Sequence, residues 1–229
     1  MAAWIAKINE TFFETGYYTM MLEGFKNTLV ITVGALLISV VIGALIAVVR
    51  YLGEDVPGLK PLVKIFEWYV NIIRGIPVVV LLLIFYYIIM KSCTNGVLVG
   101  IITFGINSSA YMAELIRSGI NAVDKGQMEA GRSLGMSRLQ CTRKIIFPQA
   151  VRYILPAVGN EFIALLKETS VAGYVAVVDL TRAGNLIRNN TFDAVNPLLA
   201  VALIYLILVL GLTALLGKME RRLAKNDKR

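Results

Sequence analysis

The chain has 229 residues, of which 57% are hydrophobic and only 17% are charged, and its mean hydropathy is +0.71. A soluble domain of this size would keep a more polar surface, so the composition predicts an integral membrane protein. The net charge of +8 comes from basic residues spread along the ends of apolar stretches. Because they form no single basic stripe, nucleic-acid binding is not expected.

Several enzyme classes are excluded by the absence of histidine and by the small number of cysteines. Without histidine there is no Ser/His/Asp triad, no Cys/His pair and no histidine-rich metal site. The two cysteines, Cys93 and Cys141, fall on opposite sides of the membrane in the topology derived below, so no disulfide between them is expected. We therefore expect no catalytic residue, no metal and no other cofactor in this chain.

The chain begins with a segment, residues 1–20, that has no continuous apolar core and contains acidic residues, unlike a signal peptide. It is predicted to lie as an amphipathic helix on the outer membrane surface. The stretch from Thr28 to Val49 that follows carries no charge and is long enough to cross the hydrocarbon as a helix.

A second span is predicted from Phe66 to Met90. Its uncharged part begins only at Gly75 and is short, so the helix is expected to take in Arg74 as an interfacial anchor. Pro77 would loosen the helix locally, because proline has no backbone N–H. A third span runs from Val97 to Ala113.

The fourth membrane segment is predicted to be broken. Its first half, Tyr153 to Leu166, contains Pro156 and Gly159, and its second half runs from Thr169 to Val178. Neither half is well suited to cross the membrane alone. Irregular backbone at membrane depth is tolerated only where it lies against protein or a water-filled path. The intervening Lys167 and Glu168 could form an ion pair that brackets the break. The broken segment therefore favours a transport path through the membrane.

A last span, Leu198 to Gly217, precedes a basic tail, residues 224–229. Basic residues concentrate in the loops after the first, third and fifth spans, which places those loops in the cytoplasm. The sequence therefore predicts five spans within a transmembrane domain, residues 21–223. Its amino terminus is expected outside and its carboxyl terminus inside the cell.

Residues 119–150, between the third and fourth spans, form a charged loop with clear helix signals. Asp124 is a predicted N-cap, with Gln127 at the third position, for a helix that runs to Leu134. Gly135 ends this helix, because glycine accepts the left-handed conformation that a sharp C-terminal turn requires.

A second helix in this loop is predicted from a second capping arrangement, Ser137 with Gln140. It should run to about Phe147 and stop at Pro148. Leu139, Ile145 and Ile146 form its apolar side, and Arg138, Arg143 and Lys144 form its basic side. Such a helix either lies on lipid head groups or inserts into a cytoplasmic partner as a rigid lever.

The loop resembles the motif that marks permease subunits of bacterial ABC importers: Glu-Ala-Ala, three residues, Gly, nine residues, Ile, one residue, Leu-Pro. The matching positions are Glu129, Ala130, Gly135, Ile145 and Pro148, while Gly131 and Phe147 stand where Ala and Leu are usual. The resemblance implies that residues 119–150 are the coupling loop, which an ATPase dimer holds and moves when it closes on ATP.

Three further segments resemble the polar amino acid permease subfamily, and the resemblance covers Tyr18 to Leu223. They are Arg74-Gly75-Ile76-Pro77, Ile106 to Tyr111, and Gly159-Asn160-Glu161-Phe162. The resemblance implies the type I ABC importer fold in the bacterial cytoplasmic membrane. It also implies a second permease subunit, two ATPase subunits that bind ATP and Mg, an external solute-binding protein and an amino acid substrate.

Glu161 is an ionisable group at membrane depth, which normally marks a path or a partner. Free carbonyls beside Pro156 and Gly159 would help it to hold the ammonium group of an amino acid. Asn107 and Ser108 are candidate second contributors, because amide and hydroxyl groups can orient a carboxylate or an amine.

Two alternatives stay open at Glu161. The carboxylate could instead pair with Lys167 or with an arginine of the partner subunit, and Asn107 and Ser108 could bond helix to helix. The chain could also be a secondary transporter or channel that uses Glu161 as a proton or ion site, although its odd number of spans shows no inverted repeat.

Overall fold

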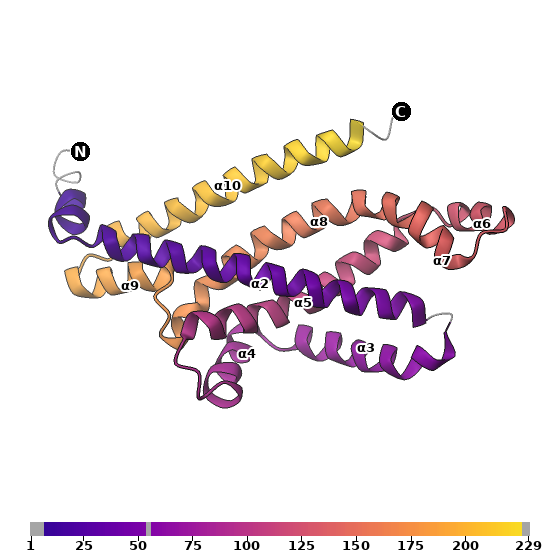
Figure 1. Cartoon of the computed structure of the whole chain (residues 1–229). Coiled ribbons are helices and arrows are strands. Elements are labelled where there is room, and N and C mark those ends of the chain that lie inside the picture. Colours follow the sequence, from indigo (N-terminus) through magenta and orange to yellow (C-terminus); the bar gives the residue numbers. More distant parts are fainter. Residues whose placement is uncertain (1–6, 54–55, 226–229) are drawn as a thin grey trace. The chain divides into compact units, whose positions relative to one another are not determined.

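The computed structural model describes residues 7–53 and 56–225, and its secondary structure there is entirely helical (Figure 1). The chain divides into two compact units. Unit 1 comprises the described residues of Met1–Leu37, Ile76–Gly105 and Ile163–Leu212, and unit 2 those of Ile38–Gly75, Ile106–Phe162 and Thr213–Arg229. The elements are η1 (Glu10–Glu14), α2 (Tyr18–Gly53), η2 (Pro57–Leu59), α3 (Lys60–Gly75), α4 (Val78–Ile84), η3 (Phe85–Ile89), α5 (Gly96–Asn121), α6 (Lys125–Ser133), α7 (Arg138–Cys141), η4 (Thr142–Ile146), α8 (Phe147–Glu168), η5 (Thr169–Val175), α9 (Leu180–Thr191) and α10 (Val195–Lys225).

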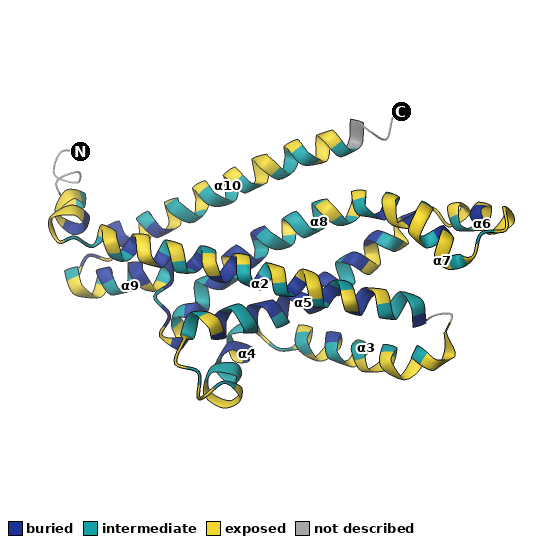
Figure 2. Cartoon of the chain, viewed as in Figure 1, coloured by how far each residue is buried: buried dark blue, intermediate teal, exposed yellow. Residues whose placement is uncertain are grey.

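Three helices in the described part of the chain are long and apolar enough to cross a membrane: α2, α5 and α10. They contain the predicted spans 28–49, 97–113 and 198–217, so those three predictions are confirmed. Only 6% of the most apolar window of α10 is buried within the chain. This helix is teal and yellow along most of its length in Figure 2, so its side chains are left for lipid or for another subunit to cover.

The second predicted span is not one continuous helix. Helix α3 ends at Gly75, and α4 begins at Val78 after Pro77, whose φ of −57° and ψ of 134° are not helical. Proline removes a backbone donor and disfavours the helical conformation of the residue before it, which explains the interruption. The two helical stretches qualify together as a broken span or a re-entrant loop. Arg74, predicted as an interfacial anchor, lies 5.3 Å from the centroid of the Tyr111 ring.

The prediction of a backbone loosened at Pro156 and Gly159 is wrong, because α8 continues through both residues to Glu168. The side-chain amide of Asn160 donates to the carbonyl of Pro156 within this continuous helix. The acceptor that a helical proline frees is the carbonyl four residues earlier, at Arg152. The break between the two predicted halves is found where they meet, because the α-helix gives way to the tighter turns of η5 at Thr169. Because α8 is not among the helices that qualify alone as spans, the count of five stays a prediction.

The second helix of the loop 119–150 does not stop at Pro148 as predicted. The helical backbone continues from α7 through η4 into α8, and Pro148 is the second residue of α8. The wide π-turn of η4 directly precedes Pro148, with the N–H of Phe147 bonded to the carbonyl of Thr142, so the regular α-helical hydrogen-bond pattern is already interrupted there. Pro148 is therefore compatible with helix on both sides.

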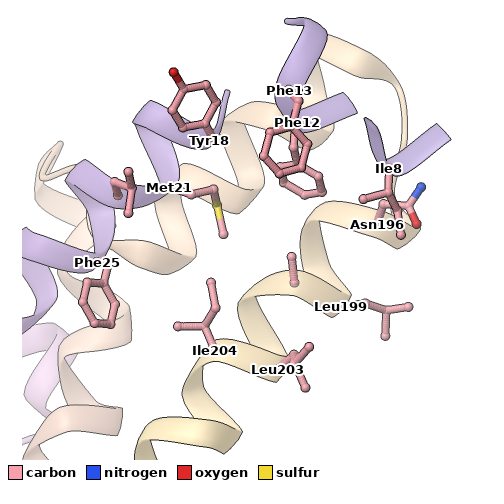
Figure 3. Close-up of a pocket in the computed structure, with 12 residues that line it drawn as sticks. Ile8, Phe12, Phe13, Tyr18, Met21, Phe25, Asn196, Leu199, Leu203 and Ile204 are labelled. Carbon is pink, nitrogen blue, oxygen red and sulfur yellow. The ribbon is translucent and has the colours of Figure 1, made fainter. Parts of the chain in front are cut away.

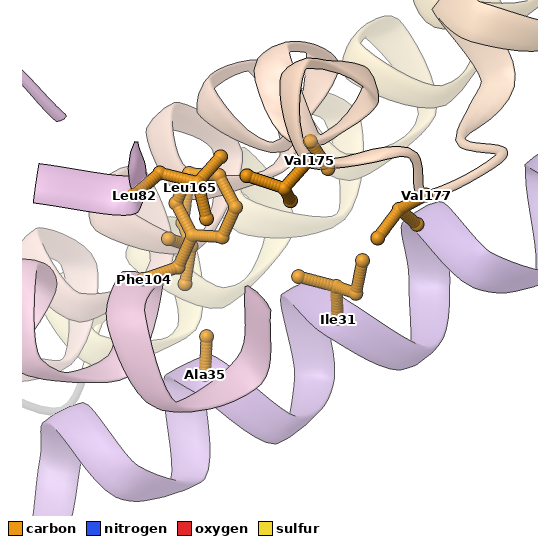
Figure 4. Packing of buried hydrophobic residues seen from close by; sticks show 8 residues of the cluster. Ile31, Ala35, Leu82, Phe104, Leu165, Val175 and Val177 are labelled. Atoms are coloured by element: carbon orange, nitrogen blue, oxygen red, sulfur yellow. The ribbon is translucent and has the colours of Figure 1, made fainter. Parts of the chain in front are cut away.

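Unit 1 is built around an apolar cluster contributed by α2, α4, α5, α8 and η5 (Figure 4). Its buried members are Ile31, Ala35, Leu82, Phe104, Leu165, Ala172, Val175 and Val177. Polar side chains of α2 hold the segment before α9: Asn27 donates to the carbonyl of Val178, and Thr28 accepts from the N–H of Leu180. These bonds fix the chain where η5 ends and α9 begins.

Within unit 1, the described part of the amino-terminal segment packs against α2 and α10. Thr11 and Phe12 of η1 are buried, and Phe12 shares an apolar cluster with Met21 of α2 and Val201 of α10. Of the predicted surface helix over residues 1–20, residues 7–14 are helical, residues 15–17 interrupt the helix, and residues 18–20 already belong to α2. The first six residues of the chain, and residues 226–229 of the predicted basic tail, lie outside the described residues.

Candidate functional site

The two helices of the loop 119–150 begin at their predicted caps, Asp124 and Ser137. The Asp124 side chain accepts from the N–H of Gly126 at the start of α6, and Gly135 has a φ of +82° just after it. The side chain of Ser137 accepts from the N–H of Gln140, whose own side chain accepts from the N–H of Ser137. This reciprocal capping box satisfies two donors at the start of α7.

Gly131 allows α6 to lie directly against α7 and η4. A Cβ atom at Gly131 would sit 2.6 Å from Sγ of Cys141 and 3.1 Å from Cδ1 of Ile145. Cys141 is fully buried. A second small cluster, formed by Val123, Ile146 and Ala150, joins the loop to the start of α8. The loop therefore has its own packed interior and is rigid for its size.

The remaining surface of the loop is exposed, as the yellow and teal of α6 and α7 in Figure 2 show. Of the predicted coupling residues, Glu129, Ala130, Gly135 and Pro148 are exposed, while Ile145 is partly buried. Two large apolar side chains also face outward, Leu134 at 82% exposure and Leu139 at 64%. Isolated exposed leucines are common, but two of them beside a charged, capped helix pair suit a partner surface.

The loop is tied to the end of α2 through Tyr51. The Tyr51 hydroxyl and Oγ1 of Thr142 share a hydrogen bond of 3.0 Å, and the guanidinium of Arg138 lies 5.4 Å from the centroid of the Tyr51 ring. A cation over an aromatic face and a hydrogen bond each add a modest stabilisation. Together they connect η4 and α7 to α2. Sequence reasoning missed Tyr51, because nothing local marks a contact 91 residues distant.

An ion-pair cluster joins three helices of unit 2. Arg50 of α2 pairs with Glu114 of α5, and Glu114 also accepts from Arg117 at 2.7 Å. The second nitrogen of Arg50 lies 3.9 Å from Glu67 of α3. The Arg50 side chain is only 14% exposed, so this cluster is better shielded from solvent than an ordinary surface pair.

Two of the three predicted substrate-site residues are in direct contact within unit 2. Oγ of Ser108, on α5, donates to Oε1 of Glu161, on α8, at 2.6 Å. Ser108 is fully buried, and its neighbour Asn107 is 3% exposed. The sequence pattern thus identified residues from distant segments that the fold brings together. A charge-assisted bond of this length holds the Glu161 side chain in one orientation.

Tyr69 of α3 belongs to the same polar region, and sequence reasoning did not identify it. Its hydroxyl lies 2.6 Å from Oγ of Ser109 and 3.1 Å from the carbonyl of Ile106. Three successive polar residues of α5, from Asn107 to Ser109, are therefore buried beside Glu161 and Tyr69. The only available signal was a tyrosine in a helix otherwise read as an apolar span.

No cluster of three or more acidic, cysteine or histidine side chains that could hold a metal ion is found among the described residues. The polar region at Glu161 contains hydroxyl, amide and carboxylate groups. These groups suit the ammonium and carboxylate groups of a small zwitterion.

The chain is similar over most of its length to known transport proteins. Residues 39–225 match the family described as binding-protein-dependent transport system inner membrane component. The chain is 36% identical to a probable glutamine ABC transporter permease protein, GlnM of Bacillus subtilis, over 91% of this chain and 95% of that one. It is also 36% identical to the glutamine transport system permease protein GlnP of Escherichia coli, over 89% and 93%.

One solved structure, described as an amino acid ABC transporter with histidines, superposes with a TM-score of 0.83 at 38% identity. It covers 91% of this chain and 96% of the matched chain. The family match spans most of the sequence, and the fold agrees. The chain therefore belongs to the binding-protein-dependent transport system inner membrane component family, as a helical membrane permease of amino acid ABC transporters.

Proposed function

We propose that this permease imports polar amino acids by alternating access, driven by separate ATPase subunits that act through residues 119–150. Its partners are two ATPase subunits, which bind ATP and Mg, a second permease subunit and an external solute-binding protein. The amino terminus lies outside the cytoplasmic membrane and the carboxyl terminus inside it, as the distribution of basic residues favours.

The observation that carries this proposal is the packed and capped loop. Glu129, Ala130, Leu134 and Leu139 are exposed on a body stiffened by the contact of Gly131 with Cys141. Tyr51 and Thr142 connect that body to α2 by a hydrogen bond. A rigid surface that is both open to a partner and attached to a membrane helix can transmit a displacement.

The polar region supports an amino acid as the substrate. The Glu161 carboxylate offers a charge for the α-ammonium group, while Ser108 fixes its orientation at 2.6 Å. Asn107 adds an amide within the same buried stretch of α5. The relatives named for glutamine transport favour a polar amino acid.

The test is reconstitution of this chain in proteoliposomes with an ATPase subunit and a binding protein of the same family. Uptake of labelled glutamine and ATP hydrolysis are measured together. We expect uptake to require ATP, and an ion gradient alone to drive none. Uptake driven by an ion gradient without ATPase subunits would overturn the proposal.

Coupling is tested with Glu129→Ala and Leu134→Asp, each compared with Glu220→Ala on the exposed surface of α10. The loop variants should lower the number of amino acids transported per ATP hydrolysed, because they alter the surface that the ATPase contacts. Glu220→Ala should leave this ratio unchanged. Normal ratios in both loop variants would contradict a coupling role for this surface.

A further inference from the structure

Unit 1 contains an apolar groove of about 670 Å³ between the amino-terminal segment and the first turns of α2 and α10 (Figure 3). Its volume lies in the range of sites that bind small molecules. The lining residues are Ile8, Phe12, Phe13, Tyr18, Met21, Leu22, Phe25, Asn196, Leu199, Ala200, Leu203 and Ile204. No residue discussed above as part of the transport site is among them.

Large apolar side chains of the groove remain open on its outer side. Phe13 is 63% exposed, Leu22 61% and Leu203 57%. The rings of Phe13 and Tyr18 stack with centroids 6.0 Å apart at its rim. An open apolar surface of this kind would be unfavourable in water, but it suits the hydrocarbon that surrounds α2 and α10.

The groove has one polar end, at Asn196. Nδ2 of Asn196 donates to Oδ2 of Asp193 at 2.6 Å, and Nζ of Lys7 lies 3.9 Å from the same oxygen. Asn196 is only 5% exposed, and its Oδ1 atom is buried without a hydrogen-bond partner among the described residues. A buried acceptor without a donor is costly, so it indicates a donor supplied from outside this chain.

We propose that this groove binds one acyl chain of a membrane phospholipid whose head group carries a hydrogen-bond donor. The acyl chain lies along Phe12, Met21 and Leu203. The head group donates an N–H or O–H to Oδ1 of Asn196, and its phosphate lies near Lys7, whose side chain is 58% exposed. A phospholipid matches both ends of the site, an extended apolar trough and a polar end with a free acceptor beside a cation.

A phospholipid fits this site better than a protein helix does. The apolar wall continues along the exposed leucines of α10, such as Leu206 and Leu210, so the groove opens onto the surface that faces hydrocarbon. The lining side chains include no charged group, and the ion pair of Lys7 and Asp193 lies at the end marked by Asn196. This separation of apolar and polar ends is typical of an amphiphile binding at the membrane interface.

The first experiment narrows the groove with Leu203→Trp and uses Leu210→Trp as its control. Both residues are exposed leucines of α10, but only Leu203 lines the groove. The full-length chain is placed in nanodiscs of mixed phospholipids, extracted with mild detergent and analysed by native mass spectrometry. We expect wild type and Leu210→Trp to retain one more phospholipid per chain than Leu203→Trp.

The second experiment tests the polar end by offering phosphatidylethanolamine and phosphatidylcholine in equal amounts. The ethanolamine ammonium donates hydrogen bonds, whereas the choline group has no N–H. One net hydrogen bond predicts about two- to tenfold enrichment of phosphatidylethanolamine in the retained fraction. Asn196→Leu should abolish this preference while keeping the lipid count.

Equal lipid retention by wild type, Leu203→Trp and Leu210→Trp would overturn the proposal. So would a change of subunit stoichiometry in Leu203→Trp without loss of lipid, because that result assigns the groove to another protein chain. Ala200→Phe provides a second way to fill the groove if Leu203→Trp does not yield a monodisperse protein. Retention without head-group preference would refute the role of Asn196.

Discussion

The loop 119–150 and the helix α8 are neighbours in the sequence, yet different interactions determine their structures. In the loop, local caps at Asp124 and Ser137 and the left-handed Gly135 decide where each helix begins and ends. In α8, Pro156 and Gly159 would end a helix by the same local rules, and they do not. Local signals dominate in the charged, exposed loop, whereas the need for satisfied backbone groups and helix packing dominate in the apolar segment of α8.

The largest expected effect concerns the α8 side of this comparison, at Glu161. Glu161→Gln keeps an acceptor for Ser108 but removes the charge, so the fold should survive. Uptake should fall by about 10- to 100-fold, the value of a charge-assisted hydrogen bond to substrate. Transport assays in proteoliposomes measure this fall in uptake, and thermal denaturation is the control for folding. Wild-type uptake by Glu161→Gln would remove Glu161 from the substrate site.

Gly159→Val tests whether packing rather than flexibility explains the glycine in α8. A Cβ atom there would lie 2.4 Å from Cδ1 of Leu216 on α10. Overpacking of this kind costs about 1–3 kcal/mol, so the midpoint of thermal denaturation in detergent should fall. Leu216→Ala should restore part of the loss.

Gly211→Ala is the matched control for Gly159→Val, because nothing lies within 4 Å of a Cβ atom at Gly211. It should leave the midpoint unchanged or raise it slightly. Equal midpoints for Gly159→Val and Gly211→Ala would contradict close packing at Gly159.

Asp179 is subject both to a local signal and to burial: it caps α9, and it is fully buried. Burial raises the pKa of its carboxyl to about 6, even though the N–H groups of Arg182 and Thr181 donate to it. The folded state therefore binds this proton more tightly than the unfolded state. The resulting stabilisation is complete below about pH 4 and is lost as the pH rises through 6.

Asp179→Asn should flatten this dependence, because asparagine is also a good N-cap and does not titrate. Between pH 4.5 and 7.5 the wild type should lose about 1–3 kcal/mol of stability relative to the variant. Thermal denaturation of both proteins in detergent across this range measures the difference. Parallel curves would show that Asp179 is not buried in its charged form.

The smallest effect is expected on the exposed side, at Gly135. Its φ of +82° disfavours any residue with a Cβ atom, so Gly135→Ala should cost about 1–2 kcal/mol. Gly58→Ala is the control, because Gly58 is equally unobstructed and has no positive φ. The two variants are compared by hydrogen exchange of the α6 and α7 amides. Equal protection in both would show that the turn tolerates a side chain.

Much of the fold followed from the sequence, because uncharged stretches such as Thr28 to Val49 and capping pairs such as Ser137 with Gln140 are local patterns. Ser108 and Glu161 were also found, since polar residues are conspicuous in apolar spans. Tyr51 and Tyr69 were missed, because their roles depend on partners on other helices. Sequence spacing carries no information about such tertiary contacts.

The two cysteines differ in exposure, so their rates of chemical modification can report on the structure of the loop. Cys93 is partly exposed, whereas Cys141 is sealed between α6 and α7 against Gly131. An alkylating reagent should therefore modify Cys93 first and reach Cys141 only when the two helices separate. The rate of the second modification would report any separation of α6 from α7 during turnover, with no engineered label.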